Sequence, residues 1–399
     1  MTQPMSNRLT VVLLSLMLGI QPVTSDLYLP ALPAITQELG AQVGQAHLTL
    51  SALLLAFGIS QLLWGPLSDR FGRRPVLLWG LTGYILAGTG CVMAPSIEAL
   101  IVWRVVQGAA MGAVVMCGRA VVRDLYTPDV GARVMSKALT GLGFIACVSS
   151  PLGAWLTDAL GWHYALAMLV LFAACTLLGV GQSFQESLRH KNANALALRV
   201  QIKTWWHIVR HPTFMAFTCL SIASFAGLFV FLTTSSFVFI GMLGLSRIEY
   251  GLLLSSMSGV YILGTLLCRR LLPRYAVQGS VAMGGALSLL GGTWMLCAAY
   301  LGWHSVAGLM TPYYLFVLAH GIHQPCGQSG AVGPFPKAAG AASALGGFLM
   351  MVTAFVTGMW LGGANDGSAM PMAQSIAFWG VLTALSAWFL VLRRGGPRV

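Results

Sequence analysis

Long apolar stretches recur along the whole 399-residue chain, separated by short polar or Pro/Gly-rich segments. About 20 apolar residues carry an α-helix across a bilayer. Dividing the chain at its charge clusters and Pro/Gly positions predicts helices over residues 9–30, 46–66, 75–95, 99–120, 134–157, 161–184, 213–240, 248–268, 279–301, 305–330, 339–363 and 372–392. The pattern therefore predicts an all-α membrane protein with twelve transmembrane helices.

One long basic connection divides these spans into two groups of six. Its positive charges are Arg189, Lys191, Arg199, Lys203 and Arg210. We expect an N-terminal six-helix bundle over residues 1–184, a cytoplasmic linker over 185–212 and a C-terminal six-helix bundle over 213–399. The run after Arg8 lacks a small-x-small cleavage site, which predicts a retained first helix and not a removed signal peptide.

The composition excludes a water-soluble enzyme. Hydrophobic residues make up 57% of the chain and charged residues only 8%, whereas soluble proteins carry about 25% charged residues. The eight cysteines form no CxxC pair, and we expect them to act as small buried hydrophobes, not as metal or redox groups.

The formal charge of +12 would suggest nucleic acid in a soluble protein. If the first helix enters from the cytoplasm, 20 of the 22 Lys and Arg residues fall on the inner side, with Arg104 in a span and Arg247 outside. The outward loops carry acidic residues instead, namely Glu38, Glu98, Asp158, Glu249 and Asp366. This asymmetry predicts that both termini are cytoplasmic. It makes the charge a topology signal, with anionic lipid contact secondary and nucleic acid not expected.

The turn between the second and third predicted helices reads GPLSDRFGRR over residues 65–74. Gly65 permits two helices to approach closely, and Gly72 permits a tight turn. Asp69 can cap the helix end or form an ion pair there. The basic residues that would hold this turn at the cytoplasmic face are Arg70, Arg73 and Arg74. A weaker similar pattern, Gly264 followed by Arg269 and Arg270, lies about 200 residues later. It indicates that the two halves of the chain are repeats of one another.

The 65–74 segment resembles the G-x-L-x-D-R-x-G-R-R/K signature of the major facilitator superfamily. This resemblance implies the major facilitator fold, two pseudo-symmetric six-helix bundles around a central cavity, with the signature acting as a conformational latch. Residues 104–108 resemble the R-x-x-Q-G element of drug:proton antiporters. Residues 26–33 are similar to the D-x-Y-x-P-A-x-P segment of the Bcr/CflA drug-resistance subgroup.

The fifth predicted helix departs from the antiporter pattern G-x-x-x-G-P-x-x-G-G. Gly141 and Gly143 are present, but Gly153 lies one position too near Pro151. Small residues and the proline still provide close packing and a bend. Whether this helix seals the pathway as it does in antiporters is left open by the altered spacing.

Placing an ionisable side chain at bilayer depth costs at least about 2.5–3.5 kcal/mol, so such a residue indicates a function. Asp26 and Arg104 fall at comparable depth near the outer ends of the first and fourth spans. Our hypothesis is that they communicate, and that Asp26 takes a proton from outside and releases it inside. The alternatives are a structural ion pair or an Asp that caps a helix at the membrane surface.

Several further side chains are candidates to line a substrate cavity. The tenth predicted helix has His320, His323 and Gln324 on one broad polar face, which predicts either a cavity lining or a helix contact around a kink. Two histidines without a carboxylate or cysteine cluster do not make a metal site. The other candidates are Tyr28 and Gln107, with Phe225 and Phe229 as an aromatic surface for amphiphilic ligands or as ordinary packing.

No P-loop, nucleophile elbow or HExxH motif is present, so neither ATP-driven transport nor an enzyme activity is predicted. The resemblance implies proton-coupled export of small amphiphilic drugs or toxic compounds across a bacterial inner membrane, by a monomer without a cofactor. A proton-coupled carrier for one metabolite, such as a nucleoside, amino acid or sugar, is the alternative. A membrane-embedded sensor or enzyme is a more distant one.

Overall fold

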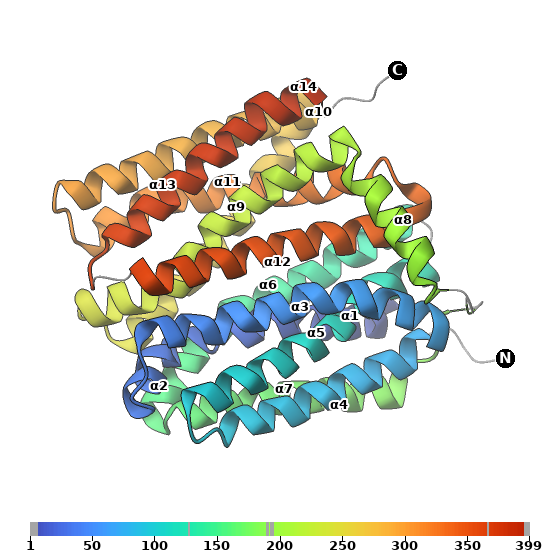
Figure 1. Cartoon of the computed structure of the whole chain (residues 1–399), viewed down its shortest axis with the longest axis horizontal. Helices are drawn as coiled ribbons and strands as arrows, with labels where there is room; N and C mark the ends of the chain where they lie inside the picture. The colour runs from blue at the N-terminus through green and yellow to red at the C-terminus, as the bar shows by residue number, and fades with distance from the viewer. Residues whose placement is uncertain (1–6, 127, 189–190, 192–194, 365–366, 395–399) are drawn as a thin grey trace. The chain divides into compact units, whose positions relative to one another are not determined.

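The computed structural model describes residues 7–126, 128–188, 191, 195–364 and 367–394 (Figure 1). Its secondary structure in those residues is helical, without a strand. The first elements along the chain are α1 (Asn7–Asp26), η1 (Leu29–Ala31), α2 (Leu32–Glu38), α3 (Val43–Phe71), α4 (Arg73–Val92), α5 (Ile97–Leu125), α6 (Pro128–Ala159) and α7 (Trp162–Ser183). They are followed by α8 (Leu198–Val209), α9 (Pro212–Ser236), η2 (Phe237–Met242), α10 (Arg247–Tyr300), α11 (Val306–Val332), η3 (Pro336–Ala338), α12 (Ala339–Ala364), α13 (Met370–Leu385), η4 (Ser386–Val391) and α14 (Leu392–Arg394).

The helices are long and apolar enough for a multi-pass membrane protein. Ten helical stretches within the described residues satisfy the length and hydropathy required to cross a bilayer. One of them, α10, has 54 residues and covers two predicted spans. Ala276, with φ of 52°, is a non-helical residue inside α10 and lies between those two spans. The predicted span 305–330 coincides with α11, which is helical but not among the ten.

Two compact units divide the chain. The first contains Met1–Ala41 and Ala52–Gln201, and the second contains Gln42–Ser51 and Ile202–Val399. Within the first unit α1 packs on α6, and α4 packs on α5 and α7. Within the second unit α10 packs on α11 and α13, and α9 packs on α11, α12 and α13.

Glycines allow the backbone of α6 to lie directly against α1. A Cβ atom at Gly141 would lie 2.3 Å from Ser15 Oγ, and one at Gly153 would lie 2.2 Å from the carbonyl oxygen of Leu27. Both positions therefore require glycine for this packing. Gly143 and Pro151 lie in the same helix, which continues through the proline.

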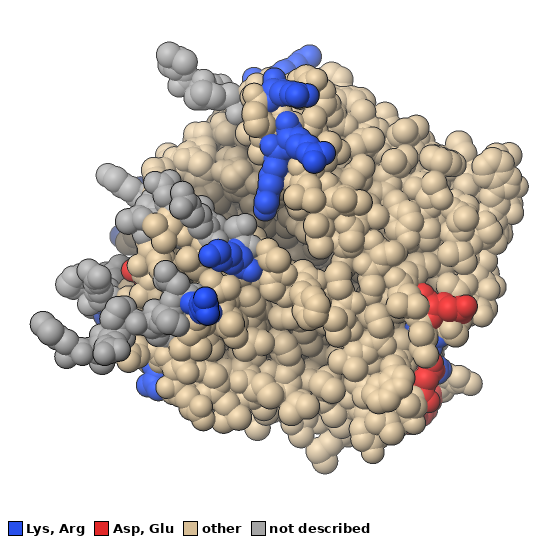
Figure 2. All heavy atoms as spheres, turned by 180° about the vertical axis from the view of Figure 1, so that it is seen from behind, with Lys and Arg blue, Asp and Glu red and all other residues tan. Residues whose placement is uncertain are grey.

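On the face seen in Figure 2, Lys, Arg, Asp and Glu side chains are few, and most of the visible surface belongs to other residue types. Asp366 and Arg189 lie outside the described residues. Arg119 is one of the 20 Lys and Arg residues predicted on the inner side. It lies inside α5, six residues before the helix ends. The cysteines are free, and the expectation of burial is wrong for Cys175 and Cys297, which are exposed on helix surfaces.

Candidate transport-site and latch residues

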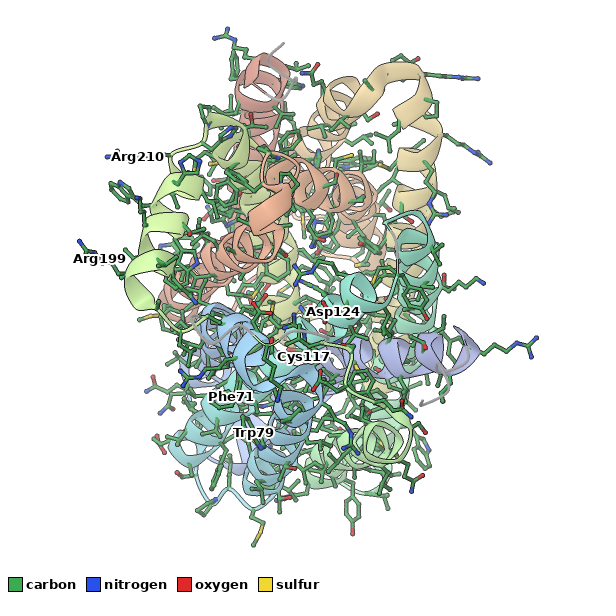
Figure 3. The ribbon with its side chains drawn as sticks, turned by 90° about the vertical axis from the view of Figure 1, so that its right-hand side faces the viewer. Phe71, Trp79, Cys117, Asp124, Arg199 and Arg210 are labelled. Atoms are coloured by element: carbon green, nitrogen blue, oxygen red, sulfur yellow. The ribbon has the colours of Figure 1, made fainter. Side chains whose placement is uncertain are left out.

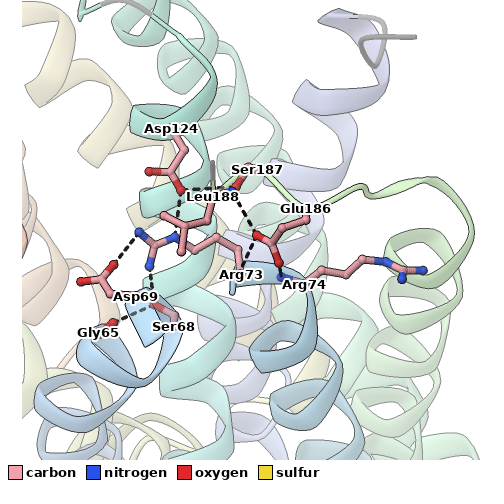
Figure 4. Close-up of polar contacts among 9 residues, drawn as sticks. All are labelled: Gly65, Ser68, Asp69, Arg73, Arg74, Asp124, Glu186, Ser187 and Leu188. Atoms are coloured by element: carbon pink, nitrogen blue, oxygen red, sulfur yellow. Dashed lines mark hydrogen bonds and ion pairs between the residues drawn. The ribbon is translucent and has the colours of Figure 1, made fainter. Parts of the chain in front are cut away.

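Arg73 organises the polar cluster at the turn between α3 and α4. Its Nη2 atom lies 2.6 Å from Asp69 Oδ1, and its Nε donates to Asp124 Oδ2 at 2.8 Å (Figure 4). Its Nη1 donates to the hydroxyl of Ser68. Although Arg73 is only 2% exposed, its three nitrogens all have partners, so burial of the guanidinium is compensated.

Glu186, in the segment after α7, caps the first turn of α4. One carboxylate oxygen accepts from the backbone N–H of Arg73 at 2.9 Å, and the other accepts from that of Arg74 at 3.2 Å. The first N–H groups of a helix have no partner within it and favour negative charge. The Glu186 carboxylate therefore supplies the hydrogen-bond acceptor for these N–H groups. The N-cap residue, Gly72, cannot supply one because glycine has no side chain.

The backbone of Gly72 has a φ of +111°. Residues with a side chain adopt this conformation only with strain. A Cβ atom there would lie 2.3 Å from Glu186 Oε2. Both the turn and the close approach of the Glu186 carboxylate therefore require glycine at this position.

The other residues of the turn have separate contacts. Gly65 contributes its carbonyl oxygen to the hydroxyl of Ser68 at 2.8 Å. The guanidinium of Arg70 lies 5.6 Å from the centre of the Phe71 ring. Arg74 Nη2 donates to the carbonyl oxygen of Gly181 at 2.9 Å, which joins α4 to α7.

Two acidic residues of this cluster were not assigned from the sequence. These residues are Asp124, which accepts from Arg73 Nε, and Glu186, which accepts from the backbone of Arg73. The missed signal for Glu186 was the glycine N-cap of α4, because a helix start without a capping side chain needs an acceptor from elsewhere.

Arg104 is fully buried in α5. Its guanidinium carbon lies 3.8 Å from the centre of the Tyr28 ring, and its Nη1 donates to Gln107 Oε1 at 3.0 Å. Arg104 Nε and Nη2 have no hydrogen-bond partner in the part of the chain that the structure describes. A buried guanidinium with two unused donors is suited to bind an acceptor that arrives during function.

Asp26, at the end of α1, is half-buried. Its Oδ1 accepts from the hydroxyl of Ser25 at 2.8 Å, and its carbonyl oxygen accepts from Ser150 in α6 at 3.1 Å. Among the described residues, no salt bridge joins Asp26 to Arg104. Both groups are thus available to change partners.

The two histidines of α11 contact different neighbours within the second unit. His320 Nδ1 lies 2.8 Å from the hydroxyl of Ser224 in α9. His323 Nε2 lies 3.3 Å from the carbonyl oxygen of Val281 in α10. Both rings are buried, at 3% and 0% exposure. Gln324 is half-buried, with its Oε1 atom unpartnered among the described residues.

The aromatic candidates of α9 are packed inside the same unit. Phe225 and Phe229 stack with their ring centres 6.5 Å apart. Phe229 is fully buried and lies against Gly358 of α12. The described residues contain no group of three His, Cys, Asp or Glu side chains placed to hold a metal ion.

A multi-pass helical protein of two units, with buried polar side chains and a basic turn held by ion pairs, has the features of a membrane transporter. The family model described as Major Facilitator Superfamily matches residues 14–358. The chain belongs to the major facilitator superfamily.

Relatives with resistance names cover most of the chain. It is 25% identical to the bicyclomycin resistance protein homolog of Haemophilus influenzae, over 98% of each chain. It is 28% identical to the chloramphenicol resistance protein of Pseudomonas aeruginosa, over 86% of this chain and 81% of the relative. For multidrug resistance protein D of Escherichia coli the identity is 27%, over 86% of this chain and 85% of the relative.

A solved structure supports the fold. The D-xylose–proton symporter matches with a TM-score of 0.76 at 16% identity, over 97% of this chain and 99% of that one. The predicted resemblance to drug-resistance members of the superfamily is confirmed by these relatives together with the family match.

Proposed function

We propose that this protein exports small amphiphilic drugs or toxic compounds across the bacterial inner membrane in exchange for protons, by alternating access. The observation that carries the proposal is the similarity, over 81% or more of each chain, to proteins named for bicyclomycin, chloramphenicol and multidrug resistance. The buried, incompletely paired Arg104 supports it, because an unpaired cation inside a membrane protein indicates a functional site.

The proposed topology has twelve spans with both termini in the cytoplasm. It counts the ten membrane-length stretches, takes α10 as two spans divided at Ala276, and adds α11. The positive-inside distribution supports this orientation. The protein is proposed to work as a monomer in the lipid bilayer, with one six-helix bundle on each side of the linker.

In the proposed cycle Asp26 carries the coupled proton and Arg104 responds to it. Among the described residues, the carboxyl group of Asp26 has only the Ser25 hydroxyl as a side-chain partner, and two donors of Arg104 have no partner. Movement that brings the two together would favour the ionised carboxylate and release the proton, whereas separation would favour protonation. The electrical driving force is about 2.3 kcal/mol per charge per 100 mV.

The remaining candidates have proposed roles in binding and conformational change. Substrate would contact the cavity residues Tyr28, Gln107, Phe225, Phe229, His320, His323 and Gln324. The turn from Gly65 to Arg74 would act as the conformational latch, and the paired state of Arg73 supports that role because it gives the turn a defined arrangement.

Export is tested by expression in an efflux-deficient bacterial host exposed to a panel of compounds that includes bicyclomycin and chloramphenicol. We expect higher inhibitory concentrations for several small amphiphilic compounds. Unchanged resistance to all of them, combined with uptake of a single nucleoside, amino acid or sugar, would show a metabolite carrier instead.

Proton coupling is tested in everted membrane vesicles with the variant Asp26→Asn. We expect loss of pH-driven drug transport while drug binding by the purified protein is kept. Asp158→Asn, which changes an exposed acidic residue of α6 in the same way, should transport normally. Wild-type transport by Asp26→Asn would exclude Asp26 as the proton carrier.

A further inference from the structure

The helix α8 (Leu198–Val209), which lies in the basic connection, has one strongly cationic face. Arg199, Lys203 and Trp206 follow the i, i+4, i+7 spacing, and Arg210 follows four residues later. Residues with this spacing lie on the same face of a helix. All four are exposed, and Figure 3 shows Arg199 and Arg210 pointing outward from α8.

Large apolar side chains are exposed beside these cations. Val200 is 64% exposed, and Ile202 and Trp206 are each 58% exposed. The guanidinium of Arg210 lies 4.3 Å from the centre of the Trp206 ring. Cations next to an exposed Trp and aliphatic side chains are the composition of helices that lie in the headgroup region of a bilayer.

Contacts near the C-terminal end of α8 fix the orientation of the helix. Ile208 is fully buried. The ring centres of His207 and His211 lie 6.1 and 5.1 Å from that of Phe335, which precedes η3. Since one face is anchored within the second unit, the cationic face cannot rotate inward to cover its apolar side chains.

The connection to the next helix places α8 at the end of a membrane span. Only Arg210 and His211 separate α8 from Pro212, where the membrane-length stretch Pro212–Met242 begins. Two residues reach about 7 Å at most. The C-terminal end of α8 therefore lies at headgroup level, where Trp and Arg side chains are favoured.

We infer that α8 binds the surface of the surrounding bilayer through anionic phospholipid headgroups. Arg199, Lys203 and Arg210 contact phosphate groups, and Ile202 and Trp206 enter the boundary with the acyl chains. Each cation near an anionic surface strengthens binding about fivefold. Bilayer lipid fits this surface better than an acidic protein does, because the covalent connection to α9 already holds α8 at the bilayer.

The experiment measures hydrogen exchange of the α8 backbone amides in the full-length protein, reconstituted in phosphatidylcholine nanodiscs with or without phosphatidylglycerol. We expect at least fivefold slower exchange when phosphatidylglycerol is present. High salt should reduce the difference, because about 1 M salt shortens the screening length to about 3 Å. Equal exchange in both lipids would overturn the inference.

Two variants with the same charge change make the test specific. The triple variant Arg199→Gln, Lys203→Gln, Arg210→Gln should lose the protection by phosphatidylglycerol. The control Arg269→Gln, Arg270→Gln, Arg274→Gln removes three exposed charges of α10 and should keep it. Protection that survives in the α8 variant, or disappears in the control, would show that these α8 side chains do not bind the lipid.

Discussion

Arg73 and Asp124 form a 2.8 Å ion pair that joins the N-terminus of α4 to the C-terminus of α5. The pair links two helix ends that are about 50 residues apart in the chain. Asp69, one turn before Arg73, contributes a second carboxylate. The turn therefore has a folded arrangement of its own, held by contacts inside the first unit.

Asp124→Asn should destabilise the protein more than Asp69→Asn. The side chain of Asp124 is 12% exposed, whereas that of Asp69 is 44% exposed and better screened by water. Breaking a largely buried ion pair costs about 3 kcal/mol, and breaking an exposed one costs about 1 kcal/mol or less. Unfolding of the two variants in detergent measures the difference, and equal destabilisation would contradict the assigned burial.

Removing the carboxylate of Glu186 should loosen the first turn of α4. We expect Glu186→Ala to cost about 0.5–2 kcal/mol, the range for loss of a helix cap. Hydrogen exchange should accelerate at the first turn of α4 and not at that of α5, where Ser96 provides the cap. Gln185→Ala, at the neighbouring exposed position, serves as the control and should leave α4 unchanged.

Gly72→Ala should be more harmful than Gly161→Ala. Both glycines are helix N-caps with nearly the same backbone, at φ, ψ of 111°, 160° and 101°, 162°. A Cβ atom at Gly72 meets the Glu186 carboxylate, whereas one at Gly161 meets nothing within 4 Å. The difference in unfolding free energy thus isolates the contact with Glu186. We expect about 1–3 kcal/mol, the usual cost of overpacking, and no difference would contradict this packing.

Apolar runs, divided at charge clusters and Pro/Gly positions, were enough to locate the long helices. Every predicted span overlaps a helix of the structure, because the length of an apolar run is set by the bilayer and needs no knowledge of tertiary contacts. The helix α8 was missed because an amphipathic surface helix does not produce a long apolar run. Its mixture of Arg, Lys, Trp and Ile looked like a charged linker.

Long-range partners of polar groups could not be found in this way. Glu186 contacts Arg73 across 113 residues of sequence, and no local pattern specifies that pairing. Likewise, the spacing of His320 and His323 predicted a shared polar face, but it could not assign one to α9 and the other to α10.

The contact of His320 with Ser224 allows a packing role of His320 to be tested separately from a role in substrate binding. A double-mutant cycle of His320→Asn and Ser224→Ala should give a coupling energy of about 1 kcal/mol in unfolding experiments, as for one buried hydrogen bond. If His320 also binds substrate, His320→Asn will change the relative resistance to different drugs, whereas Ser224→Ala will not. Identical drug profiles would restrict His320 to packing.

Gln107→Glu should impair transport without unfolding the protein. The new carboxylate would lie about 3 Å from Arg104 Nη1, since Gln107 Oε1 is at 3.0 Å now, and a charged pair binds more strongly than a neutral acceptor. Arg104 would then be less available to Asp26, and we expect pH-driven drug transport in everted vesicles to fall at least about tenfold, equivalent to about 1.4 kcal/mol. Gln37→Glu, at an exposed position of α2, controls for the added charge. If Gln107→Glu transports at the wild-type rate while Asp26→Asn does not, Arg104 has no part in releasing the proton.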